Sequence, residues 1–186
     1  NKLIRHEAVF TAMQYMGFAE RKIPYMGVGR NLSYRKSLFF SNKGFASHLH
    51  LNSGDDDLFI SDIANSANTF VETHPDSFTL SVPATDVKTW FRQRKRHFTT
   101  GFYYKSKIKA LLAGEYLSRT LFYLSFILLL SMDAFYQLYL SVYLMNLIIK
   151  GIIFKIVLIR LHERFLFIFS LLIEPFQPLL YGCIHL

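Results

Sequence analysis

The sequence predicts an α/β domain over residues 1–110, followed by an α-helical transmembrane region over residues 111–186. Charge and composition change together at this boundary. Residues 1–110 contain 16 Lys/Arg and 9 Asp/Glu, whereas residues 111–186 contain 5 Lys/Arg and 4 Asp/Glu. Leu, Ile, Phe and Tyr dominate the second region, which is typical of helices that face lipid. With 186 residues and a net charge of +8, the chain has room for one ordinary domain, or for a domain fragment with an appendage.

Alternating helix-like and strand-like patterns predict the α/β class of residues 1–110. Apolar residues recur at helical spacing in Lys2–Ala19, and the polar–apolar alternation of Ser77–Val82 is typical of a strand. The other expected elements are a turn at Pro24–Gly29, a strand or short helix at Asn31–Phe40, and helices at Leu58–Phe70 and Val87–Tyr104. We therefore expect helices and strands within one domain.

Long uncharged runs predict the membrane region. Thr120–Met132 is uncharged and, with residues 111–117 before it and interruptions only at Glu115 and Arg119, reaches the roughly 20 residues that a spanning helix needs. Ala134–Ile149 is uncharged for 16 residues, so the two runs predict a helical hairpin with its tip at Ser131–Asp133. The alternative is a set of buried helices in a large soluble core, but the 76 residues after position 110 supply no polar shell for such a core.

The end of the chain predicts further contact with a membrane. Basic residues frame apolar blocks in Lys150–Arg164, which predicts an interfacial amphipathic helix. The last stretch, Phe165–Leu186, is broken by Glu174, Pro175 and Pro178, so we expect it to span with a kink or to lie partly in the interface. If residues 1–110 are cytoplasmic, the strongly basic segments all lie on the cytoplasmic side. We therefore expect an integral protein of the cytoplasmic membrane with residues 1–110 facing the cytoplasm.

Composition also excludes several classes of protein. The apolar content of 52% excludes a disordered chain. A single cysteine, Cys183, excludes a disulfide framework and a cysteine-based zinc site. The chain begins with Asn1 rather than Met and no signal-peptide pattern follows, which suggests a fragment or a processed product.

The strongest local signal for chemistry is Ser53–Leu58, with the sequence Ser-Gly-Asp-Asp-Asp-Leu. Three adjacent carboxylates repel one another, so the group attracts a proton or a cation. A carboxylate in such a group can act as the general base for a sugar hydroxyl. The alternative is an acidic first turn of a helix, which the helix dipole favours and which needs no chemistry.

A second signal is the basic stretch Lys88–Lys109, which holds eight Lys/Arg and no acidic residue. Such a stretch suits anionic lipid headgroups, nucleic acid or a diphosphate. The alternative, a solvated run of charge beside a membrane, explains most of the cations. It does not explain why Trp90, Gln93 and Arg96 recur at helical spacing, which predicts a common face for these three residues. We expect no nucleic-acid role, because the stretch is short and adjoins the membrane region.

Two glycines, Gly27 and Gly29, precede Arg30 and Asn31 and permit a close backbone approach or a positive φ. A dinucleotide-binding fingerprint would need a third glycine and a strand directly before the motif. The third glycine is absent and no strand clearly precedes the motif, so that interpretation is excluded. His48 and His50 have the spacing of a metal pair, but an ordinary polar pair is the better interpretation without a clear third ligand.

Taken in order, these motifs resemble the C-terminal half of membrane-bound family 2 glycosyltransferases, the group that includes cellulose and hyaluronan synthases. The resemblance covers nearly the whole chain. Gly54–Leu58 is similar to the family pattern Glu-Asp-x-Asp-Leu, and Gln93–His97 is similar to Gln-x-x-Arg-Trp. Gly54 stands in place of the Glu, and His97 stands in place of the Trp that is associated with holding the acceptor in processive synthases. The resemblance therefore implies transfer of one or a few sugars.

The resemblance implies a partial fold of the GT-A type and inverting transfer from a nucleotide-sugar donor to a glycan or lipid-linked acceptor. Asp55 corresponds to the catalytic base and Asp57 to the second aspartate of the pattern. Substrate contacts are implied for Asp57, for Gln93, Arg94 and Arg96 at the diphosphate, for His97, and for Arg30 and Asn31 at the sugar pocket. The donor half and its Asp-x-Asp motif, which holds Mg²⁺ or Mn²⁺, are expected upstream of Asn1, so this chain alone is expected to be inactive.

The competing class is a non-enzymatic membrane-anchored module. In that interpretation, residues 88–109 dock anionic lipid or a protein partner, and the acidic motif only stabilises a helix end.

Overall fold

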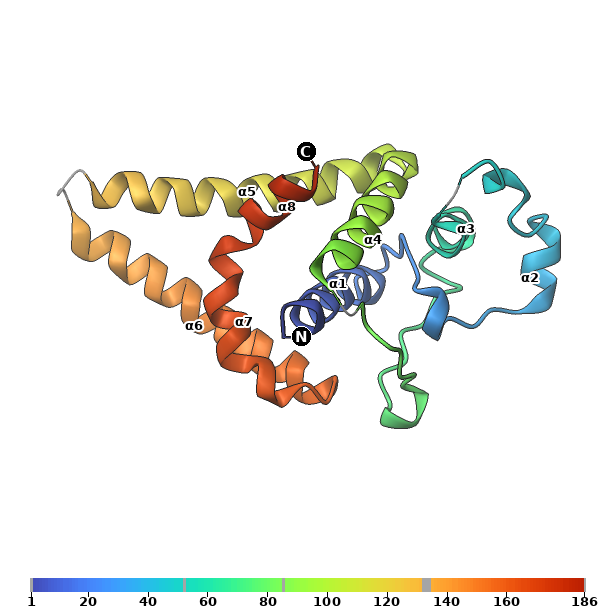
Figure 1. The fold of residues 1–186 in the computed structure, drawn as a ribbon, viewed down its shortest axis with the longest axis horizontal. Coiled ribbons are helices and arrows are strands. Elements are labelled where there is room, and N and C mark those ends of the chain that lie inside the picture. The colour runs from blue at the N-terminus through green and yellow to red at the C-terminus, as the bar shows by residue number, and fades with distance from the viewer. Residues whose placement is uncertain (1, 52, 85, 132–134, 186) are drawn as a thin grey trace. The chain divides into compact units, whose positions relative to one another are not determined.

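The computed structural model describes residues 2–51, 53–84, 86–131 and 135–185. Every regular element in these ranges is helical (Figure 1). The α-helices are α1 (Lys2–Glu20), α2 (Lys36–Ser41), α3 (Asp55–Ile63), α4 (Val87–Thr100), α5 (Ser106–Leu130), α6 (Tyr136–Arg160), α7 (Phe167–Ile173) and α8 (Gln177–His185). The chain forms two compact units. We call Glu7–Lys109 the basic unit, and the residues up to His6 together with those from Ala110 onward the apolar unit.

The predicted α/β class, and with it the partial GT-A fold, is wrong for the described residues, which contain no β-strand. The expected strand Ser77–Val82 contains no regular element beyond the 3₁₀ turn Pro75–Ser77, and Leu80 and Val82 are 101% and 88% exposed. Alternation decides which way side chains point, but a strand also needs a neighbour that pairs its backbone groups. Two side-chain bonds tie this segment to Arg30 instead: Thr79 Oγ1 donates to the Arg30 carbonyl (3.0 Å), and Arg30 Nη1 donates to Ser81 Oγ (2.8 Å).

Three helices of the basic unit were predicted, with differences at their ends. α1 and α4 begin where the sequence predicts, and Asp86 caps α4 by accepting a hydrogen bond from the Thr89 N–H at 2.8 Å. α3 begins at Asp55 and ends at Ile63, seven residues before the expected end at Phe70. It stops there because Asn68 Nδ2 donates to the Ile63 carbonyl at 2.8 Å and so starts a turn.

Aromatic rings fill the core of the basic unit. Tyr25 and Trp90 are each 2% exposed, and Phe59 is fully buried. Tyr25 makes edge-to-face contacts with Phe18 and Tyr104, with ring centroids 5.4 and 5.5 Å apart. The core therefore includes residues from α1, the following loop, α3 and α4, and it positions the end of α3 that carries the acidic motif.

The apolar unit exposes long apolar surfaces. α6, and the segment Arg164–Gly182 that contains α7 and most of α8, are each long and apolar enough to cross a membrane. Large apolar side chains of α5 and α6 lie on the surface, among them Leu121, Leu124, Ile127, Leu138, Ile148 and Ile152. Length, composition and exposure together support association of this unit with a membrane.

The helices divide the apolar unit differently from the sequence expectation. α6 runs unbroken through Lys150 to Arg160, so it joins the expected second span to most of the expected interfacial helix. The last apolar stretch breaks at the 3₁₀ turn Glu174–Phe176, where the sequence predicts a break. Met132 and Asp133 of the expected hairpin tip lie outside the described residues.

Polar side chains in the apolar unit bond to one another. Lys150 Nζ donates to Glu174 Oε1 at 2.7 Å and to the Tyr123 hydroxyl at 3.1 Å, and Tyr123 also bonds to Glu174. A second group comprises Arg119 with Glu115 and Gln177, and His6 with Gln177 and Ser170. Ionisable groups are tolerated in apolar surroundings when they are paired in this way, so these bonds link the helices of the unit.

A buried ion pair joins α1 to α4 in the basic unit. Glu7 is 3% exposed and pairs with Arg94, whose side chain is 18% exposed. Burial raises the pKa of Glu7, and the positive charge of Arg94 opposes that rise. Thr11 Oγ1 also donates to Glu7 Oε1 at 3.3 Å. Removing either charge alone therefore leaves the other one buried without its counter-ion.

We expect Arg94→Met to destabilise the protein by roughly 3–5 kcal/mol, because it leaves the Glu7 carboxylate buried and uncompensated. The double variant Glu7→Met/Arg94→Met should recover most of this loss, since no charge then remains buried. Arg92→Met, at an exposed position of α4, is the matched control and should change stability by less than about 0.5 kcal/mol. Chemical denaturation of the full-length protein in detergent measures all three. Equal effects of Arg94→Met and Arg92→Met would show that this pair does not hold α4.

Candidate functional site

The acidic motif forms the first turn of α3, and its three aspartates point in different directions. Gly54 precedes the helix in the left-handed conformation (φ 84°), and its carbonyl accepts the Leu58 N–H at 2.8 Å. Successive helical residues are rotated by about 100°, so neighbouring side chains diverge. Asp55 is exposed, Asp56 is half-buried, and Asp57 is 4% exposed. The motif therefore offers three carboxyl groups in three environments rather than one cluster.

Asp57 lies in the core beside tyrosine side chains. Burial raises its pKa to about 7, and the negative charge of Asp56 adds to that rise, while hydrogen bonds with Tyr104 and Thr100 oppose it. Tyr25 and Tyr104 respond in turn: burial raises the pKa of each, and the charge of Asp57 raises it further. Asp57 is therefore a core residue whose protonation changes near neutral pH.

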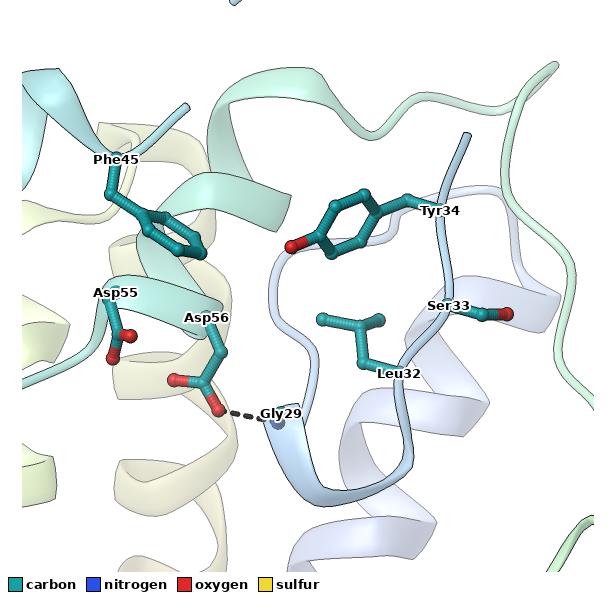
Figure 2. A pocket seen from close by; sticks show the side chains of 7 residues that line it. All are labelled: Gly29, Leu32, Ser33, Tyr34, Phe45, Asp55 and Asp56. Carbon is teal, nitrogen blue, oxygen red and sulfur yellow. Dashed lines mark hydrogen bonds between the residues drawn. The ribbon is translucent and has the colours of Figure 1, made fainter. Parts of the chain in front are cut away.

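Asp56 of α3 forms a hydrogen bond with the loop that contains Gly27 and Gly29. Its Oδ2 accepts the backbone N–H of Gly29 at 2.5 Å, as the dashed line in Figure 2 shows. A Cβ at Gly29 would lie 2.9 Å from this oxygen, so glycine permits the close approach. The bond sets the loop that carries Arg30 and Tyr34 against the start of the helix.

A cleft of about 390 Å³ lies between this loop and α3, and Figure 2 shows the residues that line it: Gly29, Leu32, Ser33, Tyr34, Phe45, Asp55 and Asp56. Tyr34 lies on the loop side of the space with its hydroxyl toward α3, and Phe45, Asp55 and Asp56 lie on the opposite side (Figure 2). The volume falls within the range of small-molecule sites, about 300–1,000 Å³.

α4 places the four residues predicted for substrate contact at different depths. Trp90 is buried, Gln93, Arg94 and His97 are half-buried, and Arg96 is exposed. Of the predicted face of Trp90, Gln93 and Arg96, Trp90 is buried and Gln93 is half-buried, whereas Arg96 is exposed, so the prediction is wrong for Arg96. Because Arg94 is engaged with Glu7, it takes part in packing α4 against α1.

His97 lies within electrostatic reach of charged residues on the loop, α3 and α4. Burial lowers its pKa, the charges of Arg94, Arg96 and Arg30 lower it further, and the charge of Asp56 raises it. The structure thus brings Arg30, Asp56 and Arg96 within electrostatic reach of one imidazole. Asn31 lies on the same loop as Arg30, is exposed, and donates its backbone N–H to the Val28 carbonyl at 2.9 Å.

Sequence reasoning missed several residues of this site. Asp56 was passed over because the family pattern leaves its position unspecified. Tyr34, Phe45, Thr100 and Tyr104 are separated from the acidic motif in sequence, and only folding brings them to it. Helical periodicity was the one available signal: it places Asp57 on the side of α3 that carries the buried residues Ile60 and Ser61.

The described residues do not form a site for Mg²⁺ or Mn²⁺. No group of three or more His, Cys, Asp or Glu side chains in the described ranges converges as a metal site would require. The three aspartates diverge, and His48 Nε2 lies 2.9 Å from Asp62 Oδ2 in an ordinary polar pair.

Comparisons with protein-family models, with curated proteins and with solved structures give no match. The resemblance to family 2 glycosyltransferases therefore depends on the motifs of this sequence alone. It stays a prediction, as do the roles that it implies for individual residues.

We expect Gly54→Ala to destabilise the basic unit. A Cβ there would lie 2.2 Å from Thr100 Cγ2, and the left-handed backbone alone costs a residue with a Cβ roughly 1–2 kcal/mol. Gly17→Ala, in α1 with open space around it, is the matched control and should stabilise by up to about 1 kcal/mol. Adding Thr100→Ser to Gly54→Ala removes the clashing methyl group and should recover part of the loss. Denaturation curves that show no such recovery would contradict the Gly54–Thr100 contact.

We expect Asp57 to make the protein less stable as the pH rises from about 4 to about 7. An unfolded Asp titrates near its ordinary value of about 3.9, whereas the buried carboxyl of Asp57 keeps its proton up to about pH 7. Between these values the folded state binds more protons, so the free energy of unfolding falls with rising pH. Asp57→Asn removes this titration and should flatten the slope, while Asp76→Asn, whose side chain is 93% exposed, should not. Identical slopes for the wild type and Asp57→Asn between pH 4 and 8 would contradict the burial.

Proposed function

We propose that this chain carries the acceptor side and the catalytic base of an inverting, membrane-anchored glycosyltransferase. The observation that supports this proposal most is the cleft between α3 and the loop that contains Gly29. The exposed Asp55 lines this cleft, and a hydrogen bond from the Gly29 N–H to Asp56 joins the loop to α3. The order of motifs along the chain, and the apolar unit that follows the basic unit, agree with it.

Asp55 is the proposed base. Of the three aspartates, Asp57 is buried and Asp56 accepts the Gly29 N–H, whereas Asp55 lines the cleft with its side chain exposed. A base must first be able to reach the proton that it removes, and Asp55 meets that geometric condition. The acceptor hydroxyl oxygen attacks the anomeric carbon of the donor as its proton passes to the Asp55 carboxylate. The bond from that carbon to the diphosphate breaks, and the sugar is transferred with inversion.

Arg96 and Arg30 are the proposed partners of the diphosphate leaving group. Both act on His97 electrostatically, as Asp56 does, so the three charges lie within electrostatic reach of one imidazole. Guanidinium groups form strong charge-assisted bonds with phosphate oxygens and stabilise the charge that develops as the diphosphate leaves. Gln93 lies one helical turn before Arg96 and His97, and we assign it a supporting polar contact. Arg94 acts by holding α4 in position.

The proposal places the basic unit on the cytoplasmic side of the cytoplasmic membrane, because the cations are concentrated there and because nucleotide-sugars are cytoplasmic substrates. The acceptor is a glycan or is lipid-linked, and membrane lipid surrounds the apolar unit. The nucleotide-sugar donor, and the Mg²⁺ or Mn²⁺ that family members use, are not assigned to residues described here.

A second candidate is a non-enzymatic basic module that docks anionic lipid. The observation in its favour is that Arg92, Lys95, Lys105, Lys107 and Lys109 are all exposed. Juxtamembrane cations attract anionic lipid with roughly 1 kcal/mol per residue. This module needs neither Asp55 nor the cleft, so the two candidates make different predictions for the same variants.

We expect Asp55→Asn to lower kcat for sugar transfer by about 10²–10⁴-fold, because a general base contributes a factor of that size. The KM for the nucleotide-sugar should stay unchanged, since Asp55 is assigned to the acceptor. Asp76→Asn is the matched control and should transfer sugar at the wild-type rate. The assay uses the full-length protein in lipid nanodiscs. Full activity of Asp55→Asn would show that Asp55 is not the catalytic base. If the wild type transfers no sugar and the triple variant Lys105→Gln/Lys107→Gln/Lys109→Gln loses lipid binding, these results would favour the basic module.

A further inference from the structure

We infer that the cleft takes an uncharged sugar ring, stacked on Tyr34, as the acceptor, and not the phosphate group of a lipid phosphate. This inference rests on the proposed function and narrows its acceptor, which the motifs leave open between a glycan and a lipid-linked group. Three properties of the lining carry it: its charge, its aromatic surface, and the arrangement of its hydrogen-bonding groups.

The charge of the lining disfavours an anion. Asp55 and Asp56 are the acidic side chains among the lining residues that the structure describes, and neither a Lys nor an Arg is among these. An acceptor phosphate would enter against two carboxylates, and like charges at short range disfavour its binding. A neutral polyol meets no such penalty, and its hydroxyl protons are attracted to carboxylate oxygens.

The aromatic surface suits the apolar face of a sugar ring. The Tyr34 side chain is 39% exposed. The centroid of its ring lies 4.9 Å from that of Phe59 and 5.8 Å from that of Phe39, and the Tyr34 and Phe39 rings are nearly parallel. Phe45, the second ring of the cleft, contacts the same two phenylalanines at 5.6 and 5.2 Å. The face of an aromatic ring carries partial negative charge, so it attracts the weakly positive C–H groups of a pyranose. Because packing already fixes these rings, binding orders few further side chains.

The polar groups of the cleft are suited to bind hydroxyl groups. Asp55 and Asp56 supply carboxylate acceptors for the protons of hydroxyl groups. Figure 2 shows these carboxylates across the cleft from Tyr34. A ring stacked on Tyr34 therefore presents its edge, where the hydroxyl groups are, toward Asp55. That is the orientation that a base needs in order to remove a hydroxyl proton.

Equilibrium binding to the full-length protein in nanodiscs tests this inference. The probes are four neutral disaccharides (cellobiose, chitobiose, lactose and maltose), undecaprenyl phosphate incorporated in the nanodisc, and inorganic phosphate. We expect at least one disaccharide to bind and neither phosphate probe to compete with it. Binding should weaken about tenfold on Tyr34→Ala, which corresponds to about 1.4 kcal/mol. Binding should be nearly unchanged on Tyr34→Phe, because this variant keeps the aromatic ring, and retained binding also shows that the cleft is folded. Phe40→Ala, an aromatic residue that is 73% exposed and not part of the lining, is the matched control and should have no effect.

Two results would overturn the inference: no disaccharide binds, or undecaprenyl phosphate displaces the bound disaccharide and its own binding weakens on Tyr34→Ala. These outcomes differ from failure of the proposed function. If Asp55→Asn abolishes transfer while no disaccharide binds, the transferase stands and its acceptor is not a neutral sugar. If a disaccharide binds through Tyr34 but transfer does not depend on Asp55, the sugar site stands and the transferase proposal fails.

Discussion

The contact between Gly54 and Thr100 is the constraint on which the candidate site depends. Gly54 turns the chain in a left-handed conformation directly before α3, and its missing side chain leaves room for the Thr100 methyl group. This contact sets the start of α3 against the end of α4. The rotation of about 100° per residue then sends Asp55 toward solvent, Asp56 toward Gly29 and Asp57 into the core. The conformation of Gly54 and the helical rotation that follows it thus place the three aspartate side chains in three different environments.

Part of this arrangement follows from the sequence, and the reasons for the failures are physical. Helical periodicity predicted α1 and α4, and the acidic motif marked the start of α3. The strand expected at Ser77–Val82 was wrong because alternation records side-chain direction and says nothing about a partner for the backbone. The predicted face of α4 failed because a spacing of three drifts by about 60° at each step, so Trp90 and Arg96 are far apart around the helix, whereas Trp90, Arg94 and His97 stay together. Asp55 and Asp57 were both predicted as site residues, and helical periodicity was the one signal that Asp57, unlike Asp55, lies on the buried side of α3.

The cations of the chain fall into groups with different physical roles, which net charge alone conceals. Arg94 in the basic unit and Lys150 in the apolar unit are paired with carboxylates, and each stabilises the packing of its own unit. Arg96 and Arg30 instead lie near His97, where an anionic group is a suitable partner. This division explains why a net charge of +8 does not by itself indicate nucleic-acid binding. Neither Arg96 nor Arg30 is among the described residues that line the acidic cleft, so the function proposed above assigns the leaving group and the acceptor to surfaces of opposite charge.

A structure of the full-length protein determined by cryo-electron microscopy with a bound disaccharide tests the central claim most directly. The account predicts a sugar ring against Tyr34, with one hydroxyl oxygen about 2.6–3.2 Å from the Asp55 carboxylate. It also predicts that Asp57 is buried beside Tyr104. Density for the disaccharide on another surface, or an Asp55 side chain that faces away from the ring while Asp57 lines the site, would contradict it.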